Sequence, residues 1–423
     1  QGDERRQKDG RRQMKKYGPI LSILTVIILI HAVILFSCMY SESRTMAQNG
    51  KTDSEEASSR FGESVEPQLP VIAPVPVDAG EGSAASTGTK SPLPAEPPVP
   101  FDPNFGKPFI YEYAVMGNIP ALPRSRNATS GILVDLTTRN VLWAKNHRKG
   151  VPIASMTKIM TCLIAYEDVV AGKYSLDTPV KVSVKAARVG GSQVYLDPRE
   201  SFSPGELMKA ATNKSANDAA YLIAEFIGGG PVQPFVDRMN AKARELRMPG
   251  TKFFNPNGLP GSTAAKDNVA SPEGMARLAE ATLRHRQLMV WASTWMDTFR
   301  KKGQKGFMQI KNHNYLLPGS SEAAKGVDGL KTGFINRSGF CLTATCLRDG
   351  RRMVAVVTGY PIRRERDRFV RQLLDWGYAR AADPAAALKK DAAASADRKK
   401  KSSSKVSSRK KVSSSGGRRN RKN

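Results

Sequence analysis

Two segments of the chain alternate apolar and polar residues. Residues 130–146 (SGILVDLTTRNVLWAKN) alternate on both sides of a Thr-Thr-Arg-Asn turn, and residues 340–360 (FCLTATCLRDGRRMVAVVTGY) alternate around Asp349-Gly350. Alternation with a period of two predicts strands, and an Asp-Gly pair between two such runs predicts a tight hairpin turn. The pattern therefore predicts one β-hairpin near each end of the region 109–379.

The segments between these hairpins have a different spacing. Apolar residues recur at three and four positions in 154–167, 219–226, 235–246 and 275–283. This spacing places them on one face of a helix. Strands at both ends with helices between them predict an α+β fold, in which one antiparallel sheet is assembled from both ends of the region and a helical part is inserted.

A third kind of pattern lies near the start of the chain. Residues 20–39 contain no charged side chain and are rich in Ile, Leu, Val and Phe. A helix of this length spans a bilayer core of roughly 30 Å. Lys and Arg residues between positions 11 and 16 precede it, and the positive-inside rule places them in the cytoplasm. We therefore expect a basic cytoplasmic segment at 1–18.

Residues 19–40 are then a signal anchor or a signal peptide. Leu35-Phe36-Ser37-Cys38 loosely resembles a bacterial lipobox, so lipidation at Cys38 is an alternative to a retained anchor. In each case the rest of the chain lies outside the cytoplasm. The expected location is the bacterial cell envelope, with the folded region in the periplasm or extracytoplasmic space and residues 20–39 in the inner membrane.

Two further segments lack any pattern of core residues. Residues 41–108 are rich in Pro and Ser, which predicts an extended, disordered linker. Residues 380–423 are mainly Lys, Arg, Ser and Ala and are expected to be a disordered tail. The remaining region, 109–379, is long enough for one catalytic domain.

Charge suggests the accessory partners of these segments. The 423 residues carry a formal net charge of +28, which favours a polyanionic partner such as nucleic acid, a membrane surface or a wall polymer. Residues 381–423 hold fourteen Lys/Arg against three Asp. Because the expected topology places this tail outside the cytoplasm, anionic lipid or an anionic wall polymer is the expected partner, and nucleic acid is not.

The content of His and Cys limits the possible chemistry. There are four His and four Cys, with no Cys-x-x-Cys pair and no His-Glu-x-x-His run, so no metal site or other cofactor is expected. No Gly-x-Ser-x-Gly nucleophile elbow occurs, which argues against a Ser-His-Asp hydrolase. If a serine is activated here, its base is not expected to be an imidazole.

Ser155-Met156-Thr157-Lys158 offers another base. Ser155 and Lys158 are three residues apart at a predicted helix start, so the amine can reach the hydroxyl. A lysine acts as a general base when burial or a neighbouring cation lowers its pKa. The alternative is structural, with Ser155 as a helix N-cap and Lys158 in solvent. The same spacing also recurs in the tail, so this motif alone favours the structural alternative.

Two more motifs favour an active site. Ser215-Ala216-Asn217 precedes an apolar helix, where Ser215 and Asp218 would also fit a capping box, and Lys331-Thr332-Gly333 leads into the second hairpin. The Ser-x-x-Lys and Lys-Thr-Gly patterns each occur once in the region 109–379, and all three motifs lie in this order at the predicted structural places. Their joint occurrence outweighs the separate structural explanations.

Together these motifs resemble the Ser-x-x-Lys, Ser-x-Asn and Lys-Thr-Gly signatures of the penicillin-recognising serine enzymes. The resemblance is closest to the low-molecular-mass penicillin-binding proteins, the serine-type D-alanyl-D-alanine carboxypeptidases. It extends to Gly191-Ser192-Gln193, Asn255-Pro256-Asn257-Gly258-Leu259 and Asn312-His313-Asn314. It implies a β-lactamase/DD-peptidase-like fold, with an antiparallel sheet flanked by helices and a helical subdomain.

The resemblance also implies roles for individual residues. Ser155 is the acylated nucleophile, Lys158 takes its proton and Ser215 relays protons. Asn217 binds the substrate backbone, while Lys331 and Thr332 of the Lys331-Thr332-Gly333 motif hold the terminal carboxylate of the substrate. The backbone N–H groups of Ser155 and Phe334 form an oxyanion hole. His313 is a structural neighbour of the site.

The implied reaction removes the terminal D-Ala from peptidoglycan stem peptides through an acyl-enzyme, with β-lactams as covalent inhibitors. A D,D-endopeptidase of cross-links would use the same site and remains an alternative. A non-catalytic tether that binds the envelope through its basic tail is a second alternative. A class A β-lactamase is disfavoured, because no Glu-x-x-Leu-Asn segment lies between Asn217 and Lys331.

Overall fold

The computed structural model describes residues 103–300 and 302–394. The expected segments 1–18 and 19–40, most of the linker 41–108 and the end of the tail lie outside the described residues. Within the described ranges, no helix is both long and apolar enough to cross a membrane.

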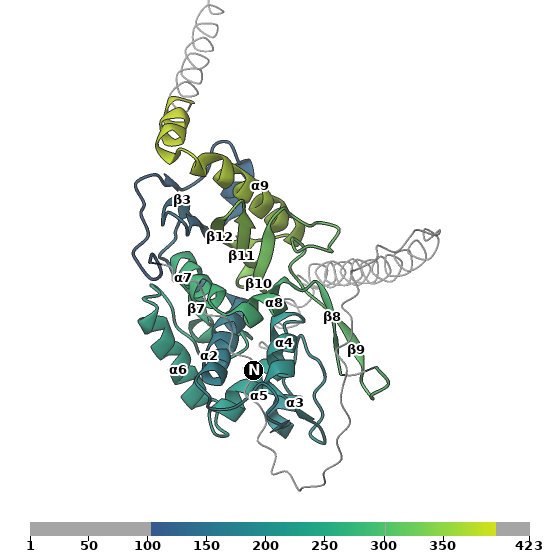
Figure 1. Ribbon diagram of the computed structural model, residues 1–423. Helices are drawn as coiled ribbons and strands as arrows, with labels where there is room; N and C mark the ends of the chain where they lie inside the picture. The colour runs from purple at the N-terminus through teal and green to yellow at the C-terminus, as the bar shows by residue number, and fades with distance from the viewer. Residues whose placement is uncertain (1–102, 301, 395–423) are drawn as a thin grey trace, which may run out of the picture. The chain divides into compact units, whose positions relative to one another are not determined.

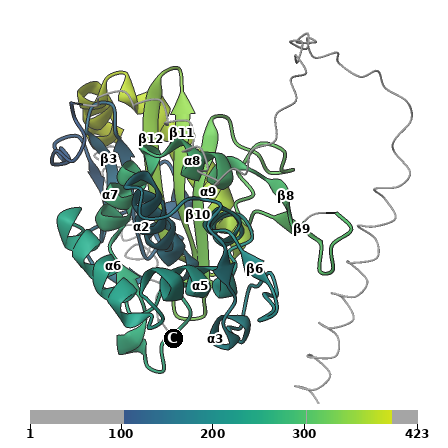
Figure 2. The same ribbon diagram turned by 60° about the horizontal axis from the view of Figure 1, so that its bottom comes forward.

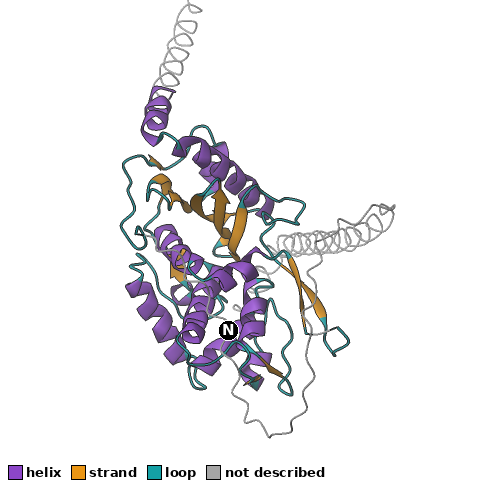
Figure 3. Ribbon diagram, in the orientation of Figure 1, coloured by secondary structure: helices purple, strands orange, loops and turns teal. Residues whose placement is uncertain are grey.

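A six-stranded sheet is built from both ends of the described chain (Figures 1 and 3). Its strand order is β1-β3-β2-β12-β11-β10. The bounds are β1 (Val115–Met116), β2 (Ser130–Asp135), β3 (Val141–Lys145), β10 (Val327–Ile335), β11 (Gly339–Arg348) and β12 (Arg351–Tyr360). All neighbours are antiparallel except β1 and β3, which pair in parallel over two residues. The predicted antiparallel sheet is therefore correct apart from this short edge strand.

Both predicted hairpins are present. β2 pairs with β3, and β11 pairs with β12 from Phe340–Tyr360 to Arg348–Arg351. Asp349 and Gly350 both adopt positive φ values, 49° and 74°, between the last two strands. Such turns match the right-handed twist of the strands that they join, and Asp-Gly tolerates them well.

One face of the sheet is covered by α9 (Arg363–Ala381), as Figure 1 shows. Leu133, Trp143 and Met353 on this face pack in one buried cluster with Phe369 and Leu373 of the helix. Burial of large apolar side chains stabilises each by about 1.5–3 kcal/mol. Because side chains alternate across a strand, the neighbours of these residues face the opposite layer.

The opposite layer is helical. It contains α2 (Lys158–Val170), α3 (Val184–Ala187), α4 (Pro204–Thr212), α5 (Asn217–Ile227), α6 (Gln233–Glu245), α7 (Pro272–Leu283) and α8 (Arg286–Ser293), with 3₁₀ turns η2 (Ala154–Thr157) and η3 (Ala264–Lys266). The 3₁₀ turn η1 (Pro123–Asn127) lies instead on the α9 side, where Arg124 pairs with Glu365. Three short ladders complete it: β4 (Val151–Pro152) with β7 (Val269–Ala270), β5 (Val180–Lys181) with β6 (Ser201–Phe202), and β8 (Met296–Phe299) with β9 (Met308–Lys311). The predicted helical segments correspond to η2–α2, α5, α6 and α7. The sheet flanked by helices and the mixed α and β content are thus confirmed.

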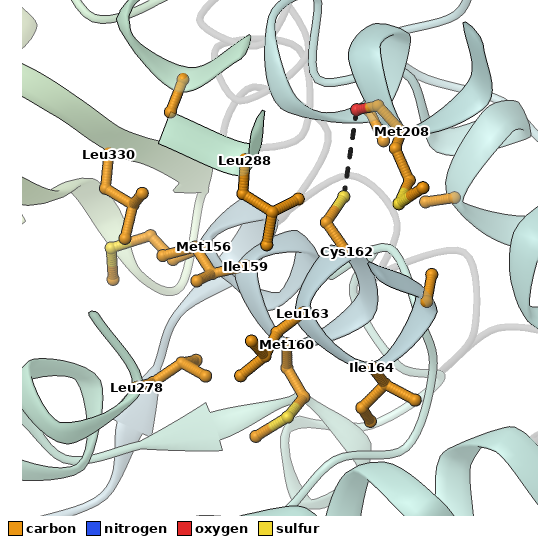
Figure 4. Packing of buried hydrophobic residues seen from close by; sticks show 14 of the residues in the cluster. Met156, Ile159, Met160, Cys162, Leu163, Ile164, Met208, Leu278, Leu288 and Leu330 are labelled. Atoms are coloured by element: carbon orange, nitrogen blue, oxygen red, sulfur yellow. Dashed lines mark hydrogen bonds between the residues drawn. The ribbon is translucent and has the colours of Figure 1, made fainter. Parts of the chain in front are cut away.

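Helix α2 lies at the centre of this layer. Met160, Leu163 and Ile164 are buried on different sides of it, and Figure 4 shows them packed among side chains from the sheet and the surrounding helices. A helix that is apolar all round is buried all round. Its N-terminal turn, which carries the first motif, is therefore fixed by the core.

Ordered residues extend beyond both ends of the expected folded region, 109–379. The backbone N–H of Gly106 donates to Glu280 at 3.3 Å, so ordered contacts begin before residue 109. At the other end α9 continues to Ala381, residues 384–394 are helical, and Arg380 pairs with Asp391. The predicted start of a structureless tail at residue 380 is wrong for these residues. Alanine has a high helix propensity, so this alanine-rich segment can form a helix without a pattern of core residues.

Candidate active site

Ser155 lies in η2, immediately before α2. Ala154 adopts a positive φ of 47°, which turns the chain sharply before the serine. The N-cap of this turn is Ile153, which makes no side-chain cap. Ser155 is therefore not a helix N-cap, which was the structural explanation of the first motif. Its hydroxyl oxygen instead accepts a hydrogen bond from Lys158 Nζ at 3.1 Å.

Lys158 is almost completely buried and has three partners. Besides Ser155, its Nζ donates to Asn217 Oδ1 at 2.7 Å and to the backbone carbonyl of Asn257 at 2.6 Å. Carbonyl oxygens only accept hydrogen bonds. When the amine is neutral, its two N–H bonds therefore go to these two oxygens. The remaining lone pair is then directed at the Ser155 hydroxyl, which is the arrangement of a general base.

The surroundings favour this neutral form. Burial is the largest cause that lowers the pKa of Lys158 well below its usual value, and the positive charge of Lys331 is the second. Burial also lowers the pKa of Lys331 to about 7, with a further contribution from the Arg366 cation. Two buried amines close together oppose each other's protonation.

Lys331 and Thr332 lie on β10, which packs against η2. A Cβ atom added to Gly333 would be 2.5 Å from the backbone oxygen of Ile153. Only glycine allows the strand to approach the nucleophile turn this closely. The ammonium of Lys331 has a single long contact, 3.4 Å to its neighbour's carbonyl, so most of its donor capacity is unused by the described residues.

The second motif lies between α4 and α5. Ser215 has a positive φ of 63°, and Ala216 is the N-cap of α5 without a side-chain cap, so the capping box considered for Ser215 does not form. Ser215 lines the cleft, and its hydroxyl makes no hydrogen bond to another described residue. Asn217 donates to Gly190 O at 2.8 Å as well as accepting from Lys158. Its amide therefore orients the base and holds the loop before Gly191.

The loop 255–259 completes the site and was not assigned a role from the sequence. Asn257 supplies the carbonyl for Lys158, and Gly258, at φ 80°, approaches so closely that a Cβ there would be 2.0 Å from Ala154 O and 2.9 Å from Ser155 N. Asn255 Oδ1 accepts from Gly258 N at 2.7 Å and from Asn257 N at 3.3 Å. The Asn-Pro-Asn-Gly run was the available signal, since Asn and Gly mark tight turns.

Asn268 holds this loop and was also missed. Its Oδ1 accepts from the backbone N–H groups of Phe254 and Asn255, and its Nδ2 donates to Asn255 O and to Thr157 Oγ1 at 3.0 Å. The side chain thereby joins the loop to the turn that carries Ser155. No local pattern marks it, because its partners are distant in sequence.

These elements surround a cleft of about 380 Å³. Of the predicted residues it is lined by Ser155, Ser215, Asn217, Thr332, Gly333 and Phe334. Lys158 and Lys331 lie behind it, where they line a cavity of about 20 Å³ with Cys162 and Thr212. The structure thus brings all eight predicted site residues to one place. Within residues 103–300 and 302–394, no group of three His, Cys, Asp or Glu side chains could hold a metal ion.

Further residues that line the cleft include the aromatic or basic side chains His313, Tyr315, Arg363 and Arg366. Arg366 is buried, and its Nη1 donates to Cys341 O at 3.0 Å. Desolvation of the imidazole, then the positive charges of Lys331 and Lys214, lower the pKa of His313 below its usual value, although the residue is exposed by surface area. A neutral ring with so low a pKa is poorly suited to act as a base at neutral pH.

Comparison with known proteins agrees with this geometry. The family described as D-alanyl-D-alanine carboxypeptidase, peptidase S11, matches residues 118–361, which include every predicted site residue. The chain belongs to this family. The resemblance inferred from the three motifs is thereby confirmed.

One curated relative within the D-alanyl-D-alanine carboxypeptidase family is DacF of Bacillus subtilis. It is 35% identical over 256 residues, which cover 60% of this chain and 63% of the relative. The chain thus spans less than two thirds of that relative's length.

Solved structures show the same fold. A peptidoglycan synthesis regulatory factor, PBP3, of Streptococcus pneumoniae has a TM-score of 0.55 at 28% identity, covering 60% of this chain and 72% of that one. Penicillin-binding protein D2 of Listeria monocytogenes, in an ampicillin-bound form, has a TM-score of 0.53 at 25% identity, covering 60% and 98%.

Proposed function

We propose that the protein is a serine D-alanyl-D-alanine carboxypeptidase that removes the terminal D-Ala of peptidoglycan stem peptides. The observation that carries the proposal is the environment of Lys158. The amine is buried, its pKa is lowered, and its two carbonyl acceptors leave its lone pair for Ser155. Family membership supports the same chemistry.

In the proposed acylation, Ser155 Oγ attacks the carbonyl carbon of the penultimate D-Ala while its proton passes to Lys158 Nζ. The carbonyl electron pair moves onto oxygen, where the backbone N–H groups of Ser155 and Phe334 would stabilise it. The C–N bond then breaks, and the leaving amine of D-Ala takes the proton from Lys158 through Ser215. Water hydrolyses the ester by the same route, and Ser155 recovers its proton.

Lys331 and Thr332 are proposed to hold the terminal carboxylate of the substrate. The unused donor capacity of the Lys331 ammonium supports this role, because a substrate carboxylate would satisfy it. The carboxylate would also stabilise the protonated form of Lys331. In the same site Asn217 orients Lys158, and its amide lies where the substrate backbone would pass.

β-Lactams would acylate Ser155 because they carry a carboxylate and a strained amide in the same order as the substrate. The ampicillin-bound form of the Listeria protein supports this expectation. We also propose that residues 20–39 anchor the protein in the inner membrane of a bacterial envelope, and that the basic tail binds anionic lipid or a wall polymer. These two assignments depend on the sequence patterns alone.

One experiment tests the enzymatic proposal. The full chain is incubated with a stem pentapeptide and, separately, with penicillin, and D-Ala release and the mass of the protein are measured. We expect D-Ala release and a stoichiometric adduct on Ser155, both absent in Ser155→Ala. If wild type gives neither, the proposal is wrong. Digestion of intact sacculi then separates loss of terminal D-Ala from cleavage of cross-links, the endopeptidase alternative.

A further inference from the structure

A second cavity adjoins the catalytic cleft. It has a volume of about 390 Å³, comparable to the cleft itself. Tyr221 of α5, Val236 of α6, and Phe254 and Pro256 of the following loop contribute to its walls. Helices α5 and α6 lie side by side in both views (Figures 1 and 2). We name this cavity the α5–α6 hollow.

The hollow and the cleft share one wall. Leu259 lines both cavities, and Asn257, which holds Lys158 on its cleft side, also lines the hollow. A ligand long enough to pass Leu259 can therefore occupy both. An extended chain of four residues reaches about 13 Å, so a stem peptide acylated on Ser155 is long enough to pass a wall of one side chain.

The side chains that line the α5–α6 hollow indicate which kind of ligand group it could bind. Phe254 is 40% exposed, Tyr221 is half-buried, and no charged side chain belongs to the lining. A charged group placed there would lose water, which is costly, and the Lys252 ammonium, 5.9 Å from the centre of the Phe254 ring, could pair only with an anion. A neutral ring with one apolar face can instead pack on the aromatic side chains, and Gln233 at the rim can bind an amide.

Peptidoglycan contains both charged groups and neutral rings. Its stem peptide carries carboxylates, whereas the N-acetylated sugar rings to which the peptide is attached are neutral in this linkage and have apolar ring faces. We propose that the α5–α6 hollow is a subsite for an N-acetylhexosamine ring of the glycan strand whose stem peptide occupies the catalytic cleft. This inference depends on the proposed function, and it identifies the substrate as glycan-linked peptide rather than free peptide.

The test compares two substrates on the full chain: a free stem pentapeptide and the same pentapeptide attached to its disaccharide. For wild type we expect kcat/KM for D-Ala release to be higher with the disaccharide attached. An aromatic contact is worth about 0.5–1.5 kcal/mol, which corresponds to roughly two- to tenfold. Phe254→Ala and Tyr221→Ala should each reduce this preference by that factor. Because Tyr221 has no part in holding Lys158, Tyr221→Ala should hydrolyse the free pentapeptide as wild type does.

Phe307→Ala is the matched control, because Phe307 is equally exposed, at 39%, but precedes β9. It should retain the full preference. Equal kcat/KM for both substrates in wild type, or a preference unchanged in both hollow variants, would overturn the subsite. Failure of the proposed function is distinct: the free pentapeptide itself would not be hydrolysed.

Discussion

Lys158 Nζ lies 2.6 Å from the backbone oxygen of Asn257, a residue 99 positions further along the chain. The carbonyl fixes one N–H bond of the amine and so helps to direct its lone pair at Ser155. Because the acceptor belongs to the backbone, no substitution of Asn257 removes it directly. Residues that hold the loop in place therefore control the base.

Asn268→Ala should slow acylation of Ser155 by penicillin more than it destabilises the fold. Loss of the amide releases Phe254 N, Asn255 N and Thr157 Oγ1 together, so the Asn257 carbonyl is no longer held against Lys158. We expect the acylation rate constant to fall by about tenfold, equivalent to ~1.4 kcal/mol, as measured by stopped-flow or by labelling with fluorescent penicillin.

Asn240→Ala is the control for this variant. Asn240 also binds backbone groups, Phe253 N, Phe253 O and Val236 O, but its side chain makes no hydrogen bond to the 255–259 loop. It should lower the melting temperature by a similar amount and leave the acylation rate constant near that of wild type. Equal slowing by both variants would show that Asn268 has only a structural role.

Gly258→Ala should abolish acylation in a protein that still folds. The added Cβ would meet Ala154 O at 2.0 Å and Ser155 N at 2.9 Å, so the nucleophile turn must move. Gly229→Ala is the control. Gly229 has a φ of 72°, close to the 80° of Gly258, so the backbone strain is similar, but nothing lies within 4 Å of an added Cβ. Both variants should lose about 1 kcal/mol of stability from the left-handed backbone. Normal labelling of Gly258→Ala would contradict the proposed geometry.

The pH dependence of acylation should depend on Lys331. Acylation requires neutral Lys158, so its rate should fall as the pH drops through the lowered pKa of that amine. Removing the positive charge in Lys331→Met takes away one cause of the lowering and raises the pKa of Lys158. The acidic limb of the pH–rate profile should therefore move to higher pH. A shift to lower pH, or none, would count against coupling between the two amines.

Phe369→Ala should destabilise the protein without changing the site. Phe369 is fully buried between α9 and the sheet, at a ring distance of 5.5 Å from Trp143. Truncation of such a side chain costs about 3–5 kcal/mol, which chemical denaturation would measure. The fraction that remains folded should acylate near the wild-type rate, because Phe369 packs on the sheet face opposite η2. The first turn of α9, whose Arg363 and Arg366 line the cleft, keeps its own hydrogen bonds to Glu322 and to Cys341 O. A much slower rate would indicate that α9 positions the nucleophile.

The sequence predicted the elements that local patterns specify. The two hairpins follow from alternation and an Asp-Gly turn, and the helix that carries Lys158 follows from its apolar spacing. The three motifs indicated the site because each has an unusual composition at a helix start or strand. Such signals need only neighbouring residues.

What was missed depends on contacts between distant segments. Asn268 joins a loop to Thr157, 111 positions away, and nothing adjacent to it in sequence predicts this role. The parallel pairing of β1 is too short for any periodicity. Ser215 matched a capping pattern, yet its positive φ moves its side chain from the helix end into the cleft. In each case tertiary structure overrides a local preference.

The position of β12 in the sheet has a consequence for how the site is made. β12 pairs with β2 from Met353–Asp135 to Thr358–Ser130, and so joins the first strands of the domain to β11 and β10. All three motifs are already present by residue 333, but the strand that connects the two halves of the sheet begins at Arg351. A chain released before that point would carry every signature residue without a sheet to bring Lys331 against η2. Reactivity towards penicillin should therefore arise late and in a single step during synthesis, which makes covalent labelling a measure of completed folding.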